Sequence, residues 1–341
     1  MMTRRRSVRP PAPPAPPPSL TSVVTTAVHR QVALTVAIAL TLTAGMTLPV
    51  AHLPGPASPA FLPTWAILAV VADALTAYLF FGQFLCTRQP ALAALAGAYL
   101  YSSLIIVPYL LTFPHVFAAG GLFHAGAQTA IWLWVCWHGG FPLGILIYLW
   151  VEHRYGDVRL RRAGPVADLD LGRPLYRLVF PCLGRVGLVT WGLVTWGLSA
   201  VAGVGLLLRT RGRTMAPLWL SLVMLASMLD VILTISAGSR YSVGWYMARV
   251  NSLMEAGIVL CALLYEINHH YSRLVEQEQA AQTMNHQLRA ANEALDKLAR
   301  EDALTGVPNR RTILALATAE LARYRRYRWR LRDPGHRRRQ F

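Results

Sequence analysis

The sequence predicts a mostly α-helical fold: a polytopic transmembrane helical bundle of seven or eight spans, followed by a coiled-coil helix. Three observations predict this class. The 341 residues are 54% hydrophobic and only 14% charged, whereas soluble domains usually carry about 25% charged residues. Seven apolar runs approach or exceed the roughly twenty residues that a transmembrane helix needs. A seven-residue apolar repeat follows the last of these runs.

The first thirty residues predict a disordered leader. Four arginines, Arg4, Arg5, Arg6 and Arg9, precede a proline-rich stretch at residues 10–18 that cannot pack as a helix. The first apolar run covers residues 32–53 and is longer than the core of a signal peptide. We therefore expect a helix that stays in the membrane.

Six further apolar runs predict the remaining spans, at residues 61–86, 91–111, 125–151, 186–208, 216–237 and 247–266. Lipid offers no hydrogen bonds to the backbone, so a bundle of helices is the structure that these runs can form. We assign residues 31–266 to one membrane-embedded domain.

The placement of arginines predicts the orientation. Positively charged loops favour the cytoplasmic side, which places the leader, Arg88 and residues 152–185 there. Seven spans would then put both the arginines of residues 209–213 and the C-terminus outside. We therefore expect an eighth crossing, with residues 175–183 as a weak candidate, and a cytoplasmic C-terminus at a bacterial inner membrane. The net charge of +17 then indicates contact with anionic membrane lipid, and no nucleic acid.

Residues 267–300 predict a coiled-coil signalling helix. Ile267, Leu274, Ala281, Leu288 and Leu295 recur every seven residues, and Met284, Ala291 and Leu298 follow at a second core position. This spacing predicts a homodimer through residues 267–298. The alternative is a lone amphipathic helix on the membrane surface.

Several segments of the apolar region have a specific composition. They include Asp73-Ala-Leu-Thr, Trp137-His-Gly-Gly-Phe-Pro-Leu, Leu229-Asp230 and Arg240-Tyr-Ser-Val-Gly-Trp-Tyr. Together they resemble the fourth class of bacterial membrane-associated sensor domains over about residues 30–270. The resemblance implies an even number of spans and an unidentified signal ligand.

A carboxylate in mid-span costs about 2.5–3.5 kcal/mol on insertion, so it is expected to face the bundle interior and find a partner there. We expect Asp73, Asp230, Arg249 and Glu255 to form interior pairs. Such pairs suit a ligand pocket or a proton- or ion-sensitive switch; the alternative is a polar clamp that fixes helix packing. The candidate sensor residues are Asp73, Gln128, His138, Asp230, Arg240, Tyr241, Trp245, Tyr246, Arg249 and Glu255.

A haem-binding or transport protein is a further alternative. His124 and His138 are fourteen residues apart, about 21 Å along a helix, so each would need a histidine from another helix as the second axial ligand of haem. The four cysteines form no CxxC pair, so we predict no metal site.

The segment Asp302-Ala-Leu-Thr-Gly-Val-Pro-Asn-Arg-Arg resembles the opening of a GGDEF domain, the catalytic module of diguanylate cyclases. The resemblance implies that intact relatives use Mg²⁺ and condense two GTP into cyclic di-GMP. It also implies that this segment couples the incoming helix to the catalytic fold. The residues expected to do so are Asp302, Leu304, Thr305, Gly306, Asn309, Arg310 and Arg311.

The elements that would carry the chemistry are missing from these 341 residues. No GG(D/E)EF string occurs, and from about residue 328 the sequence is a divergent basic tail. We expect residues 301–341 to be the N-terminal fragment of an α/β GGDEF domain, cut by a frameshift or truncation, with no catalytic residue and no cofactor. The alternatives are a genuine basic tail that rests on the membrane, and a non-enzymatic module that dampens an intact cyclase.

Overall fold

The structure is a computed structural model that describes residues 24–123, 125–126, 128–155, 188–210, 214–302 and 305–331. Within these ranges it contains helices and isolated bridges but no strand. The chain divides into two compact units, Met1–Ile267 and Asn268–Phe341.

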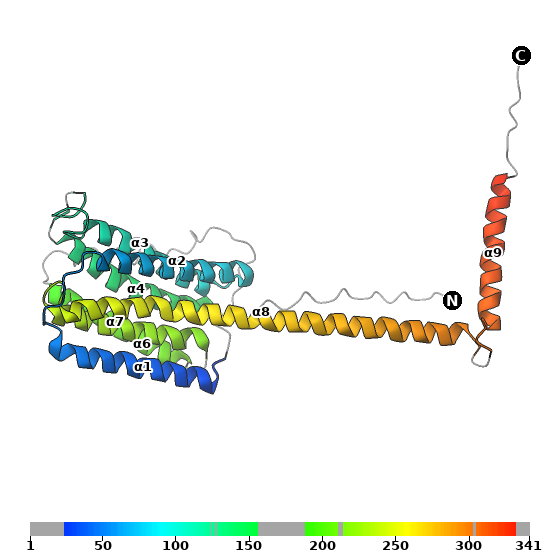
Figure 1. Cartoon of the computed structure of the whole chain (residues 1–341), viewed down its shortest axis with the longest axis horizontal. Coiled ribbons are helices and arrows are strands. Elements are labelled where there is room, and N and C mark those ends of the chain that lie inside the picture. Colours follow the sequence, from blue (N-terminus) through cyan, green and yellow to red (C-terminus); the bar gives the residue numbers. More distant parts are fainter. Residues whose placement is uncertain are drawn as a thin grey trace, which may run out of the picture. The chain divides into compact units, whose positions relative to one another are not determined.

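Seven helices in the described ranges are long and apolar enough to cross a membrane. They lie side by side as a bundle (Figure 1), which confirms the predicted class of a multi-pass helical membrane protein. Their bounds are α1 Ala27–Thr47, extended by the 3-10 turn η1 Leu48–Val50, α2 Phe61–Thr87, α3 Pro90–Thr112, α4 Thr129–Tyr155, α6 Leu188–Thr210, α7 Met215–Ala237 and α8 Val243–Arg300.

Two helix boundaries differ from the sequence prediction. α1 begins at Ala27, inside the predicted leader, because Thr26 caps it: the His29 amide donates to the Thr26 hydroxyl, and the His29 ring accepts from the Thr26 amide. The last span and the predicted coiled-coil helix are one continuous helix, α8. The candidate eighth span, residues 175–183, lies outside the described residues.

The turn between α2 and α3 is short. α2 ends at Thr87, the next residue, Arg88, has a left-handed φ of 58°, and Pro90 is the first residue of α3. A left-handed residue ends a helix and a proline suits the first helical position. The two helices therefore form an antiparallel hairpin.

α4 and α6 run parallel to each other. Near their starts the rings of Trp132 and Trp191 are 6.3 Å apart. Near their ends Arg209 Nε lies 3.3 Å from Glu152 Oε2. Consequently the end of α4 and the beginning of α6 lie at opposite ends of the bundle.

Small residues bring α3 and α4 close together. A Cβ atom on Gly144 would lie 2.7 Å from the Cβ atom of Ala98, and one on Gly140 would overlap the Tyr101 ring. Close backbone approach through small residues is the usual way that helices associate in lipid. This packing places the polar side chains of α3 and α4 within reach of one another.

The second unit contains the last part of α8 and the helix α9, Arg310–Leu331. Its described residues show one isolated bridge, between Glu301 and Pro308, and no strand. A fragment of an α/β domain is therefore not shown.

Candidate functional site

The centre of the candidate site is a buried pair between α4 and α7. His138 Nε2 lies 2.7 Å from Asp230 Oδ2, and the two side chains are 2% and 3% exposed. Sequence reasoning expected Asp230 to have an interior partner, and the structure gives it a histidine. Burying a carboxylate and an imidazole costs less free energy when the two groups are hydrogen-bonded to each other.

The second ring nitrogen of His138 is held by its own helix. His138 Nδ1 lies 3.0 Å from the carbonyl oxygen of Trp134, which can only accept a hydrogen bond. The ring is therefore fixed between Asp230 of α7 and the preceding turn of α4. Both nitrogens are engaged, so His138 has none left for a haem iron in this structure, and His124 lies outside the described residues.

Thr234 extends the pair toward α8. Its hydroxyl donates to Asp230 Oδ1 at 3.2 Å and accepts from Arg249 Nη1 at 3.4 Å. Arg249 Nη2 also donates to the Tyr109 hydroxyl at 2.8 Å. Five side chains from four helices, α3, α4, α7 and α8, therefore form one hydrogen-bonded chain.

Arg249 is buried but forms no ion pair with an acid among the described residues. Aromatic rings hold its guanidinium group: Trp245 lies 4.8 Å and Trp65 6.0 Å from its central carbon. Cation–π contact of this kind stabilises a desolvated arginine by about 2 kcal/mol. The predicted acid–arginine pair is therefore replaced by a cation in an aromatic cage.

Asp73 belongs to a second branch. The Ser102 hydroxyl donates to Asp73 Oδ2 at 2.5 Å, and Trp137 Nε1 donates to the same hydroxyl at 2.7 Å. Trp137 precedes His138 in the chain and its ring packs against the histidine ring at 4.4 Å. This contact joins the branch of Asp73 to the buried pair.

Glu255 is 9% exposed and makes no hydrogen bond or ion pair within the described ranges. It interacts electrostatically with Asp230 and Asp73. It is therefore an acid on α8 that lies near the other two acids without a partner of its own.

We call the hydrogen-bonded set the interior polar network. Its members are Asp73, Ser102, Tyr109, Trp137, His138, Asp230, Thr234 and Arg249. Sequence reasoning named Asp73, His138, Asp230 and Arg249 but missed the other four. A hydroxyl or indole in an apolar helix was the available signal, but such residues also occur at many positions outside the network.

Two candidates lie outside this network on the surface. Gln128 is exposed and immediately precedes α4, where its carbonyl accepts from the Trp132 amide at 3.0 Å. Arg240 is exposed, lies 4.3 Å over the Phe113 ring and donates to the Pro114 carbonyl at 3.1 Å. They are loop residues rather than interior residues.

The other residues of the Arg240–Tyr246 segment join the start of α8 to the loop before α2. The Gly55 amide donates to the Tyr241 carbonyl at 2.7 Å, and the Tyr246 hydroxyl donates to the Pro56 carbonyl. A side chain on Gly244 would overlap Ala51, so only glycine permits this approach. Buried Trp245 then faces Arg249.

The segment at Asp302 joins α8 to α9. Asp302 Oδ1 accepts from the Thr305 amide and hydroxyl, both at 3.1 Å. Asn309 caps α9 by accepting from the Thr312 amide at 3.0 Å, and its own amide group donates to the Ala299 carbonyl. Gly306 has the positive φ of 68° that the turn requires.

The expected coupling residues therefore fall into two groups, those that form the turn between α8 and α9 and those that are exposed. Asp302, Thr305, Gly306 and Asn309 make the connection, while Arg310 and Arg311 are exposed. Leu304 lies outside the described residues.

Comparison with protein families gives one assignment. Residues 56–166 and 188–271 match MASE4, described as a membrane-associated sensor, integral membrane domain. No curated protein and no solved structure matches the chain significantly. The matched residues contain the whole interior polar network and the Arg240–Tyr246 segment. The chain therefore belongs to the MASE4 family of integral membrane sensor domains.

Proposed function

We propose that this chain is a membrane sensor of the diguanylate cyclase type, in which the bundle detects a signal and α8 transmits it. One observation carries the proposal: α8 contributes Arg249 to the interior polar network and continues without interruption to Arg300. A change in the network therefore acts on the helix that leaves the membrane domain.

The network suits a switch because its members come from several helices. Among the described residues, hydrogen bonds join Arg249 to Asp230 through Thr234, so a signal that disturbs the His138–Asp230 pair also changes what holds α8. Small shifts of one packed helix against others are a common way to transmit a signal.

Pairing of two chains through residues 267–298 completes the proposal. The apolar seam of this part of α8 is exposed in the single chain, with Leu274 62%, Leu288 54% and Leu295 63% accessible. Exposed apolar residues at heptad spacing favour a parallel partner. In relatives of the cyclase type, two catalytic domains must face each other, so a dimeric rod would bring them together.

The chain itself is proposed to make no cyclic di-GMP, since it has no GG(D/E)EF string to hold Mg²⁺ and GTP. Incubation of the purified protein with GTP and magnesium should leave the nucleotide unchanged. Formation of cyclic di-GMP would overturn this part of the proposal.

The sensing role is tested by fusing residues 1–300 to an active cyclase domain and measuring cyclic di-GMP in cells. Asp230→Asn keeps the size of the side chain and removes its charge, and Arg249→Gln removes the guanidinium group that joins α8 to the network, so we expect both to alter the output. Val204→Ala, at an exposed position of α6, is the matched control. Unchanged output from folded Asp230→Asn and Arg249→Gln fusions would contradict a sensing role.

A second candidate function uses the same exposed seam. The chain would pair with an intact cyclase and leave the mixed dimer with a single active half-site. Co-purification of this chain with a full-length cyclase, and its loss on Leu288→Lys, would support damping. Strictly separate complexes would contradict it.

A further inference from the structure

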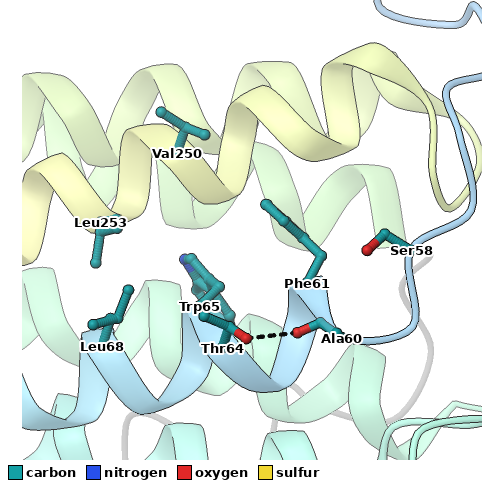
Figure 2. Close-up of a pocket in the computed structure, with 8 residues that line it drawn as sticks. All are labelled: Ser58, Ala60, Phe61, Thr64, Trp65, Leu68, Val250 and Leu253. Atoms are coloured by element: carbon teal, nitrogen blue, oxygen red, sulfur yellow. Dashed lines mark hydrogen bonds between the residues drawn. The ribbon is translucent and has the colours of Figure 1, made fainter.

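A pocket of about 330 Å³ lies between α2 and α8 (Figure 2). This volume is at the lower end of the range of small-molecule sites, about 300–1,000 Å³. None of its lining residues is charged. The ones that carry the argument are Ser58, Phe61, Trp65, Leu68, Val250 and Leu253.

The pocket is open to the lipid side of the bundle. Leu68 and Val250 are 50% and 44% exposed although they belong to membrane-spanning helices, while Trp65, at 4%, forms the inner wall. A molecule dissolved in the bilayer can therefore enter from the side, without passing through water.

The polar groups of the pocket define the head of its ligand. The Thr64 hydroxyl is already used, donating to the Ala60 carbonyl at 2.8 Å. The partly buried Ser58 hydroxyl makes no hydrogen bond to the described residues, and Figure 2 shows it on the side of the pocket. One hydroxyl and no charge suit an uncharged head that can form a hydrogen bond.

The apolar walls define the body of the ligand. Phe61, Leu68, Val250 and Leu253 line the pocket with apolar side chains, so the pocket suits a hydrocarbon chain. An anionic head would lack a cation among the lining residues, and its desolvation would oppose binding.

The inner wall connects the pocket to the interior polar network. Trp65 Nε1 donates to the Ser252 hydroxyl at 3.1 Å, and Ser252 donates to the Arg249 carbonyl at 3.0 Å. Val250 and Leu253, on the same turn of α8, touch the ligand space directly. A ligand in the pocket would therefore press on Trp65, which contacts the Arg249 guanidinium group and is linked through Ser252 to the Arg249 backbone.

We propose that this pocket binds an uncharged, lipid-soluble amphiphile with a single hydrocarbon chain, and that its occupancy is the signal passed to α8 through Trp65. The claim that occupancy is the signal rests on the proposed sensor function, whereas the claim that the pocket binds the amphiphile does not.

Binding is tested on the full chain in lipid nanodiscs with dodecanol that carries a photoreactive diazirine. We expect saturable labelling of peptides from α2 and α8, displaced by plain dodecanol and not by dodecyl phosphate. Leu253→Trp fills the pocket and should abolish saturable labelling. Leu264→Trp, equally large and 51% exposed on the same helix but outside the pocket, should retain it.

The outcomes of these experiments distinguish the binding claim from the signalling claim. Labelling that never saturates, or that Leu253→Trp leaves intact, overturns the binding site and leaves the sensor function standing. Saturable labelling without a dodecanol response in the cyclase fusion overturns the signalling role, provided that Asp230→Asn changes the output of that fusion. Displacement by dodecyl phosphate overturns the uncharged head.

Discussion

Asp230 Oδ2 lies 2.7 Å from His138 Nε2, and Asp230 Oδ1 accepts a hydrogen bond from the Thr234 hydroxyl, so both oxygens are used. The acid is 2% exposed, so neither water nor lipid can replace a lost donor. At the scale of single residues, the stability of the interior therefore depends on His138.

We predict that His138→Ala destabilises the protein by about 3–5 kcal/mol, the usual cost of leaving one member of a buried pair alone. Asp230→Ala should cost a comparable amount. The double variant should be more stable than the sum of the two effects implies, because it leaves no unpaired charge. Thermal unfolding in detergent measures all three variants, and simple additivity would contradict the pairing.

Single residues also show where sequence reasoning reaches its limit. The presence of Asp73, Asp230 and Arg249 in apolar spans was enough to select them. Their partners depend on which faces of α3, α4 and α7 meet, and nearly uniform apolar composition leaves those rotations undetermined. The histidine partner of Asp230 and the aromatic cage of Arg249 therefore required the structure.

At the scale of elements, the contact of α3 with α4 depends on glycine. We predict that Gly144→Leu destabilises the protein by about 1–3 kcal/mol, as overpacking does, because its Cβ atom would meet Ala98. Gly97→Ala is the control: nothing lies within 4 Å of its added Cβ atom, and alanine suits a helix better. Equal thermal stability of the Gly144→Leu variant and the parent would contradict the close contact.

The heptad seam of α8 makes a second prediction at this scale. In a chain without its native cysteines, we expect Leu288→Cys to form disulfide-linked dimers on mild oxidation, because core positions of a coiled coil face each other. His286→Cys lies on the opposite side of the helix and should stay monomeric on reducing-agent-free gels. Equal cross-linking at both positions would indicate random collision.

At the scale of the whole molecule, the spans were predictable because length and hydropathy define them, whereas the number of crossings was not. Seven runs gave an external C-terminus against the arginine pattern. α4 and α6 run parallel to each other, so Tyr155 and Leu188 lie at opposite ends of the bundle. The eighth crossing stays a prediction.

This geometry gathers the arginines at one end. Arg88 directly follows α2, Arg154 lies in the last turn of α4 and Arg209 in that of α6. The His29 ring at the start of α1 lies 6.2 Å from that of Tyr265, so α8 leaves the bundle at this same end. Positive residues favour the cytoplasm, which supports a cytoplasmic rod.

The resulting topology can be tested with two single cysteines in a cysteine-free chain. Ala119→Cys lies in the exposed loop after α3, at the end opposite the arginines, and should react with a membrane-impermeant maleimide in intact cells. Ala290→Cys lies on the exposed rod of α8 and should react only after permeabilisation. The opposite pattern would put the rod outside, away from cytoplasmic GTP, and the proposed coupling to a cyclase would then be impossible. Labelling of both residues in intact cells would exclude a bundle whose two ends face different compartments.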